Sequence, residues 1–185
     1  MEKDELRQRL RLARAALPVS DRRHFAAAAV QHLISIPNVS GVQNIGLFAS
    51  VRDEIDTRPV FEHLISMGKT VFFPRMQKSS HALTWGALAS WDALVAGPMG
   101  IGQPEEAPSD AQELDLIVVP GLGFGLNGGR LGYGAGWYDR TLDVFKGPVV
   151  GLGYNCQVLD FVPAEAHDQP VHWIVTELRA IPVGN

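Results

Sequence analysis

LDLIVVPGLGFGLNGGRLGYGAGWYDR, residues 114–140, decides the fold, because it joins an apolar strand to a glycine-rich loop and then to a helix. Residues 114–119 are apolar enough for a strand that is buried on both faces of a sheet. The helix is expected from about residue 136 to residue 144. Such a strand, loop and helix indicate an α/β fold, in which ligands bind beyond the carboxyl ends of the strands. The loop contains eight glycines, at positions 121, 123, 125, 128, 129, 132, 134 and 136.

Helices and strands alternate on both sides of this stretch. Apolar residues at helical spacing predict a first helix over residues 3–17. Ser20 is expected to cap a second, alanine-rich helix that ends near residue 34, and Thr57 to cap a third over residues 58–67. Further strands are expected at residues 44–49, 70–73, 149–152 and 172–175.

The order of these elements predicts the architecture. Apolar strands with helices between them favour a mostly parallel sheet that is covered by helices on both faces. Pro74 is expected to stop the strand at residues 70–73, and residues 76–113 show no clear pattern. No linker divides the chain, so we expect a single three-layer α/β domain over residues 1–185.

The composition limits the kind of protein. With 46% hydrophobic residues the chain should fold into a globule, and its net charge of −4 argues against a general nucleic-acid binder. The single cysteine, Cys156, excludes an internal disulfide. No apolar run approaches the roughly 20 residues that span a bilayer, and the opening MEKDELRQRL lacks the apolar segment of a signal peptide. We therefore expect a cytoplasmic monomer that binds neither nucleic acid nor membrane.

The glycine-rich loop has the features of a phosphate site. Its glycines allow positive φ angles and close approach of the backbone to a ligand, and the helix after it presents unpaired N–H groups. Arg130 can pair with phosphate oxygens, and Asp139 could hold Mg²⁺ against a phosphate. The alternative is a long surface loop that binds no ligand.

Basic residues are concentrated near the amino end of the sequence, where seven of the 16 precede residue 24. This segment either faces an anionic ligand or forms a solvated helix face. Residues 123–128 match the GxGxxG dinucleotide fingerprint by letter, but they do not open a helix, and the six histidines lack zinc-site spacing. The seven basic residues are Lys3, Arg7, Arg9, Arg11, Arg14, Arg22 and Arg23.

The second half of the loop, RLGYGAGWYDR at residues 130–140, resembles the RLGxGxGYYD signature of 5-formyltetrahydrofolate cyclo-ligases, also called methenyltetrahydrofolate synthetases. The resemblance extends over nearly the whole chain in five shorter pieces that keep the family's order. These pieces are KDELR at residues 3–7, SVRDEIDT at 50–57, FFPR at 72–75, DLIVVPGLGF at 115–124 and PAEAHDQPVHWIVTE at 163–177.

The resemblance implies an enzyme that uses ATP and Mg²⁺, with Lys3 and Arg130 as catalytic residues at the phosphates and Asp139 and Asp168 as Mg²⁺ ligands. Glu54 would accept paired N–H bonds from the pterin. The implied ATP site comprises Lys3, Asp4, Glu5, Leu6, Arg7, Arg130, Leu131, Gly132, Tyr133, Gly134, Ala135, Gly136, Trp137 and Tyr138. The implied folate site comprises Arg7, Ala49, Glu54, Tyr133, Gly134, Ala135, Gly136 and Trp137.

Without the resemblance, the pattern around Lys3 would indicate a solvated helix residue and that around Asp168 a turn residue. Glu54 would be either a surface acid or a ligand. Three positions also depart from the family. Gly125 and Trp137 stand where the family often has Asp and Tyr, and Met99 stands where an aromatic residue is common.

The implied activity is the ATP-dependent cyclisation of 5-formyltetrahydrofolate to 5,10-methenyltetrahydrofolate, with release of ADP and phosphate. The formyl oxygen would attack the γ-phosphate of ATP, and the neighbouring secondary amine would then displace phosphate from the activated carbon. The protein would contribute mainly positioning and charge neutralisation. Two other interpretations stay open, namely a non-catalytic folate or nucleotide sensor and an isomerase or transferase on a similar scaffold.

Overall fold

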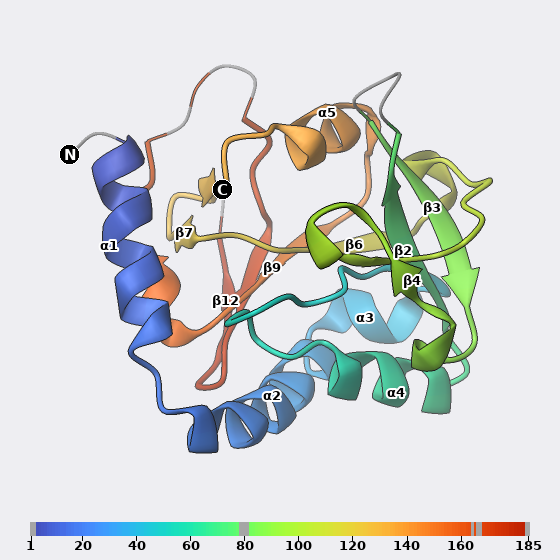
Figure 1. Cartoon of the computed structure of the whole chain (residues 1–185), viewed down its shortest axis with the longest axis horizontal. Helices are drawn as coiled ribbons and strands as arrows, with labels where there is room; N and C mark the ends of the chain where they lie inside the picture. Colours follow the sequence, from blue (N-terminus) through green and yellow to red (C-terminus); the bar gives the residue numbers. More distant parts are fainter. Residues whose placement is uncertain (1–2, 78–81, 164, 166–167, 184–185) are drawn as a thin grey trace.

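The computed structural model describes residues 3–77, 82–163, 165 and 168–183. Its centre is a seven-stranded sheet with the strand order β12-β11-β9-β6-β1-β2-β3 (Figure 1). The five inner strands are parallel to one another, and the edge strands β3 and β12 are antiparallel to their neighbours. The strands are β1 (Asn44–Gly46), β2 (Thr70–Met76), β3 (Leu83–Leu88), β6 (Leu116–Val119), β9 (Val149–Leu152), β11 (Trp173–Val175) and β12 (Ala180–Pro182).

Helices cover both faces of this sheet (Figure 1). Leu116 and Val118 of β6 belong to the core beneath α2, α3 and α4, whereas Ile117 and Val119 belong to the core beneath α5. Successive residues of a strand point to opposite faces, so the apolar run of β6 serves both layers. The predicted three-layer α/β fold with a mostly parallel sheet is confirmed. The helices are α2 (Val19–Ile34), α3 (Pro37–Gly41), α4 (Arg58–Ser66) and α5 (Trp137–Val144).

The helix α1 (Lys3–Ala15) lies beside the main sheet and not on either of its faces (Figure 1). It packs against a small sheet of β7 (Gly123–Gly125), β8 (Arg130–Leu131) and β10 (Val158–Leu159) that the sequence did not predict. Leu6 and Leu10 of the helix join Leu131 and Val162 in a core cluster of their own. Part of the glycine-rich loop therefore forms a β-hairpin, and α1 packs against it.

Both expected helix caps differ from the prediction. The helix α2 begins at Val19 with Pro18 in the cap position, so Ser20 lies inside its first turn and donates to Asp21. Thr57 does precede α4, but its hydroxyl donates to the carbonyl of Phe48 at 2.8 Å and does not cap the helix. This bond ties the start of α4 to the chain that leaves β1.

The strand β2 continues through Pro74 to Met76, so the prediction that Pro74 stops it is wrong. Pairing of β1 with β2 ends at Phe72, whose carbonyl accepts from the N–H of Leu47. Alternate residues of a strand bond to opposite neighbours, so the missing N–H of Pro74 faces the side that β1 has left. Pairing with β3 is not interrupted.

The region 76–113, which showed no sequence pattern, contributes β3 and a short hairpin of β4 (Val95–Ala96) and β5 (Gly102–Gln103). Three short 3-10 segments connect these strands to each other and to β6. Among the described residues, no helix combines the length and the apolar character needed to cross a membrane.

Candidate active site

A cavity of about 830 Å³ lies where β1, β2 and β6 end, lined by Phe48, Pro74 and Pro120 from the chain just after or at these ends. The connection after β1 leads to α4 on one face, and the connection after β6 leads to α5 on the other. Adjacent strands whose connections leave on opposite faces form a switch point, which is where open α/β sheets bind ligands. The cavity also has the size of a small-molecule site.

The glycine-rich loop forms one wall of this cavity, through residues 130–139. Gly134 and Gly136 have φ angles of +99° and +68°, which residues with a Cβ rarely adopt. Gly136 also precedes α5, and within the described part of the chain no side chain caps that helix. The expected helix start is thus confirmed, and the positive end of its dipole lies at the cavity wall.

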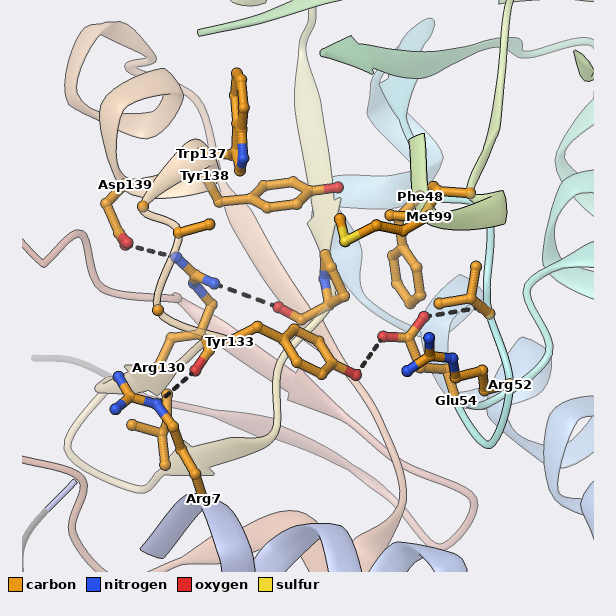
Figure 2. Close-up of a pocket in the computed structure, with 18 of the residues that line it drawn as sticks. Arg7, Phe48, Arg52, Glu54, Met99, Arg130, Tyr133, Trp137, Tyr138 and Asp139 are labelled. Carbon is orange, nitrogen blue, oxygen red and sulfur yellow. Dashed lines mark hydrogen bonds and ion pairs between the residues drawn. The ribbon is translucent and has the colours of Figure 1, made fainter. Parts of the chain in front are cut away.

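Arg130 is held below this loop with its side chain only 4% exposed. Its Nη2 donates to Asp139 Oδ1 at 2.5 Å and its Nη1 to the carbonyl of Pro120 at 3.4 Å (Figure 2). The ring of Tyr138 lies over the guanidinium at 5.6 Å. Arg130 Nε is buried without a hydrogen-bond partner in the described part of the chain. A buried cation with an unused donor beside a helix start suits a bound anion.

The helix α1 presents a basic face to the cavity. Lys3, Arg7, Arg11 and Arg14 recur at intervals of three or four residues, so they share one side of the helix, and all four line the cavity. Arg7 Nε donates to the carbonyl of Gly132 at 3.1 Å, which attaches the helix to the glycine-rich loop. These four basic residues of α1 therefore face the cavity, whereas Arg9 of the same helix is exposed and lies outside its lining.

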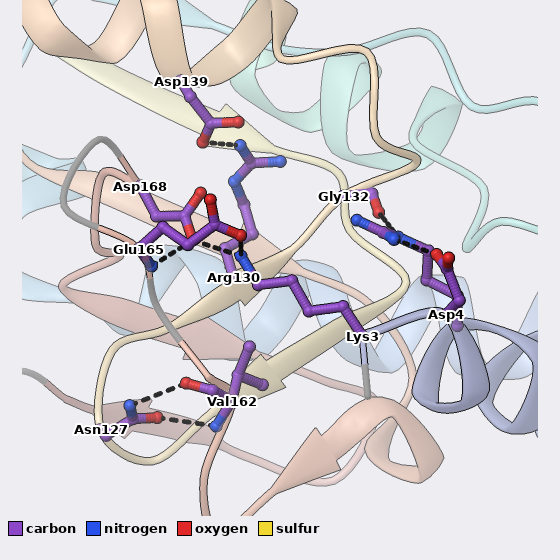
Figure 3. A network of polar contacts seen from close by, with 10 residues as sticks. Lys3, Asp4, Asn127, Arg130, Gly132, Asp139, Val162, Glu165 and Asp168 are labelled. Carbon is purple, nitrogen blue, oxygen red and sulfur yellow. Dashed lines mark hydrogen bonds and ion pairs between the residues drawn. The ribbon is translucent and has the colours of Figure 1, made fainter. Parts of the chain in front are cut away.

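Lys3 lies between two carboxylates from the far end of the sequence. Its Nζ is 2.7 Å from Glu165 Oε1 and 2.8 Å from Asp168 Oδ2 (Figure 3). Burial would lower the pKa of Lys3, but the bonds and charges of Asp168 and Glu165 outweigh burial and raise this pKa above its ordinary value. Lys3 therefore stays charged at the end of the cavity that also contains Asp139.

Glu54 lies at the other end of the cavity, in the loop between β1 and α4. Its Oε1 accepts from the hydroxyl of Tyr133 at 2.8 Å and its Oε2 from the N–H of Val51 at 3.0 Å (Figure 2). Burial raises the pKa of Glu54, against the lowering effect of these two bonds and of the Arg14 charge. The carboxylate is thus a desolvated acceptor that faces the cavity, and not a surface acid.

Apolar side chains line the wall near Glu54. Phe48 and Ala49 follow β1 and line the cavity, and Met99 at the tip of the β4–β5 hairpin lies beside Phe48 (Figure 2). Met99 has a φ of +57° and is 75% exposed as a residue. Trp137 lines the cavity as well, but it packs partly on the core beneath α5, with the Arg140 guanidinium 5.7 Å from its ring. This wall can cover an aromatic ligand next to the carboxylate.

The structure brings most of the expected site residues to this one cavity. Asp4, Glu5 and Leu6 are the exceptions, since none of them lines it. Leu6 points into the core cluster under α1, Glu5 is exposed, and Asp4 is exposed and paired with Arg7. A helix turn cannot present five consecutive side chains to one side. The expected residues that line the cavity are Lys3, Arg7, Ala49, Glu54, Asp139, Asp168 and residues 130–138.

Several lining residues were given no site role by the sequence, among them the charged residues Arg14, Asp53 and Glu165. Arg14 could have been found by extending the helical spacing from Lys3 and Arg7 by two more steps. Asp53 and Glu165 are neighbours of expected residues, but only the fold shows what they contact. Gly125, a departure from the family, lies outside the cavity lining, and a Cβ there would be 2.1 Å from Asn127 Oδ1.

Asn127 explains why no side chain fits at position 125. Its Nδ2 donates to the carbonyl of Val162 at 3.1 Å, and its Oδ1 accepts from the N–H of Val162 at 3.1 Å (Figure 3). Glycine at position 125, where the family often has Asp, is therefore the residue that fits the local hairpin, and this departure from the family does not alter the cavity.

Two carboxylates that line the cavity, Asp139 and Asp168, suit Mg²⁺ that also binds substrate phosphates. They do not form a site that could hold a metal ion through protein ligands alone. Among the described residues, no group of three His, Cys, Asp or Glu side chains converges on one point. Asp139 and Asp168 both line the cavity, and each already contacts a cation, Arg130 and Lys3 respectively. One or two carboxylates together with substrate phosphates and water form the usual environment of Mg²⁺.

Comparison with known proteins gives a consistent result over nearly the whole chain. The sequence model of the 5-formyltetrahydrofolate cyclo-ligase family matches residues 1–177. The mouse and Escherichia coli K12 proteins named 5-formyltetrahydrofolate cyclo-ligase are each 30% identical to this chain; the alignments cover 94% and 90% of it and 90% and 96% of the relatives.

Two solved structures are similar as well. The NMR structure of Aquifex aeolicus 5,10-methenyltetrahydrofolate synthetase superposes with a TM-score of 0.86 at 31% identity, covering 100% of this chain and 94% of that one. A 5,10-methenyltetrahydrofolate synthetase from Mycoplasma pneumoniae superposes with a TM-score of 0.76 at 22% identity, covering 96% and 99%, which supports the fold alone.

Proposed function

The chain belongs to the 5-formyltetrahydrofolate cyclo-ligase family and is a ligase, and we propose that the cavity described above is where it converts 5-formyltetrahydrofolate to 5,10-methenyltetrahydrofolate at the expense of ATP. The observation that carries this proposal is the division of the cavity into two chemically different ends. One end has cations and the start of α5, and the other has a buried acceptor beside apolar side chains.

The cationic end suits the triphosphate. The positive dipole end of α5 and the buried Arg130 favour an anion, and Lys3 and Arg7 add charge from α1. Lys3 is held by Asp168 and Glu165 without ligand, so it would exchange part of that pairing for phosphate oxygens. Lys3 and Arg130 are in this proposal the residues that neutralise charge on the transferred phosphoryl group.

The opposite end suits the folate. Glu54 accepts hydrogen bonds through both oxygens, and each oxygen has a further lone pair for the N–H groups of a pterin edge. Phe48, Ala49 and Met99 supply an apolar cover for the ring system. The formyl group of a folate bound in this way would point along the cavity toward the phosphates.

The reaction needs little covalent chemistry from the protein. The formyl oxygen attacks the γ-phosphorus, the bond to ADP breaks, and the formyl carbon becomes electrophilic. The neighbouring secondary amine of the folate adds to this carbon and loses its proton, and phosphate leaves with the formyl oxygen to give the methenyl bridge. The site would contribute by alignment of the two substrates and by exclusion of water.

Mg²⁺ is part of the proposal. Asp139 and Asp168 would hold it, and its charge would offset that of the phosphates. A single domain over residues 1–185, a monomeric state and a cytoplasmic location remain predictions from the sequence.

The test is incubation of the purified chain with ATP, Mg²⁺ and 5-formyltetrahydrofolate. We expect the ultraviolet absorption of the methenyl product to grow only when ATP is present, with about one ADP released for each methenyl group formed. A folate sensor would bind 5-formyltetrahydrofolate without ADP release. Absence of ATP-dependent product from folded protein would overturn the proposal.

A further inference from the structure

Arg14 is the most deeply buried cation of α1, with a side chain that is 4% exposed. Its Nε and Nη2 donate to the two oxygens of Asp53 at 2.9 Å each, and Nη2 also donates to the hydroxyl of Tyr133 at 2.9 Å. Burial would raise the pKa of Asp53, but the bonds and charge of Arg14 outweigh burial and lower it. The pair is therefore charged at neutral pH and fixed in a bidentate geometry.

The direction of the hydrogen bonds in this network follows from the groups themselves. A guanidinium has only donors, so the oxygen of Tyr133 must accept from Arg14. The hydroxyl has one proton, and it lies 2.8 Å from Glu54 Oε1, so that proton is donated to Glu54. Burial and the nearby Glu54 charge raise the pKa of Tyr133 to about 12, which keeps the proton on the hydroxyl at neutral pH.

We propose that Arg14, oriented by Asp53, is a positioning residue for the folate end of the site: it fixes the Tyr133 hydroxyl so that Glu54 remains an acceptor aimed into the cavity. This inference rests on the proposed function, because it assigns the folate to Glu54. It assigns a role to three side chains, namely Arg14 from α1, Asp53 from the loop after β1, and Tyr133 from the glycine-rich loop. The hydrogen bonds of this network connect the three parts of the cavity wall to Glu54 Oε1.

The proposal gives Arg14 an effect that a purely structural residue would not have. The groups that act on Glu54 are the Val51 N–H and Asp53 on its own loop, Arg14 on α1, Tyr133 on the glycine-rich loop, and Tyr138 on α5. Removing Arg14 takes away a positive charge and leaves the Asp53 carboxylate without its hydrogen-bonded partner, so the pKa of Glu54 rises further. More Glu54 is then protonated at a given pH, and less of it can accept from the folate.

The experiment compares Arg14→Met and Tyr133→Phe, singly and together, with the parent. Arg9→Met is the matched control, since Arg9 is exposed on the same helix and outside the cavity lining. We expect Arg14→Met to raise KM for 5-formyltetrahydrofolate about tenfold, the loss of one charged hydrogen bond, with KM for ATP within about twofold of the parent. Tyr133→Phe loses only a hydroxyl from a residue that is 46% exposed, so this variant tests the network even if Arg14→Met does not fold.

Two further readouts separate positioning from general disturbance. The ratio of variant to parent KM for the folate should fall as the pH is raised, because Glu54 regains its charge. The double variant should be no worse than the poorer single variant, because Arg14 acts through the Tyr133 hydroxyl. A parent-like KM in Arg14→Met or Tyr133→Phe, a pH-independent ratio, or an equal loss for ATP would overturn the inference alone. A parent and an Arg9→Met control that do not bind 5-formyltetrahydrofolate would instead overturn the proposed function, and the inference with it.

Discussion

Replacement of Gly134 by valine tests whether the glycine-rich loop holds phosphates. Gly134 has a φ of +99°, and the nearest atoms to a Cβ built there are those of the Arg7 guanidinium, at 3.9 Å. The substitution therefore causes no clash in the free protein. Its cost comes from the backbone angle and from a branched side chain placed where the chain would approach a ligand.

The backbone cost can be estimated. A residue with a Cβ in a sparsely populated φ region costs about 1–3 kcal/mol. For a chain of this length each kcal/mol lowers Tm by about 2–4 °C, so Gly134→Val should lose roughly 2–12 °C. The loss of one or more N–H bonds to phosphate should weaken ATP binding by about 10- to 100-fold, from about 1.5–3 kcal/mol per charged hydrogen bond.

A second glycine separates the two effects. Gly68, which ends α4, has a φ of +75° and no atom within 4 Å of a Cβ built there, and it does not line the cavity. Gly68→Val should thus carry a similar backbone cost without touching the ligand. ATP affinity measured by calorimetry and Tm measured on the same samples give the comparison.

We expect both variants to be destabilised and only Gly134→Val to lose ATP affinity. If Gly134→Val folds and binds ATP as the parent does, the loop does not hold the phosphates. If both variants lose ATP affinity in proportion to their loss of stability, the glycine is needed for folding alone. Either result would refute the assignment of the cationic end of the cavity to ATP.

Three further outcomes are expected. Glu54→Gln exchanges an acceptor for a donor and should raise KM for 5-formyltetrahydrofolate about 10- to 100-fold; an unchanged KM would contradict the folate assignment. Asp139→Asn should raise the Mg²⁺ concentration that gives half-maximal activity several-fold, which corresponds to about 1–2 kcal/mol of lost attraction. Its affinity for the folate, measured by calorimetry, should equal that of the parent. A parallel loss of Mg²⁺ response and folate affinity would argue against a metal role. Arg14 lowers the pKa of Asp53, so their pairing stabilises the fold above about pH 4, and this stabilisation is lost as the pH falls through the pKa of the folded state. The free energy of unfolding of Asp53→Asn should therefore fall less steeply with acidification than that of the parent, and equal slopes would contradict this.

The inner strands could be predicted because they are buried on both faces and hence are continuous apolar runs. The edge strand β3 lies among prolines and glycines, and β12 is partly exposed, so neither has that signature. Pro74 was misjudged because its effect depends on which neighbour its missing N–H would face, and pairing is not visible in one segment.

The site divides in a similar way. The glycine-rich loop, Arg130 and Asp139 are contiguous in sequence, so their chemistry could be predicted together. Arg14 is 39 residues from Asp53 and 119 from Tyr133, and only the fold brings these side chains into contact. Leu6 lies outside the cavity lining because a helix turns its successive side chains to different sides, which a short motif taken as a whole does not show.

The contact between Lys3 and Asp168 joins residues that are 165 positions apart. Contacts of such long range are slow to form, because the entropy of closing the loop must be offset by other contacts. The partners that bury Leu6 and Leu10 of α1, namely Leu131 and Val162, are also distant in sequence. The helix α1 therefore cannot dock until these distant partners have been synthesised. The four basic side chains of α1 that line the cavity can complete it only in chains in which this docking has taken place.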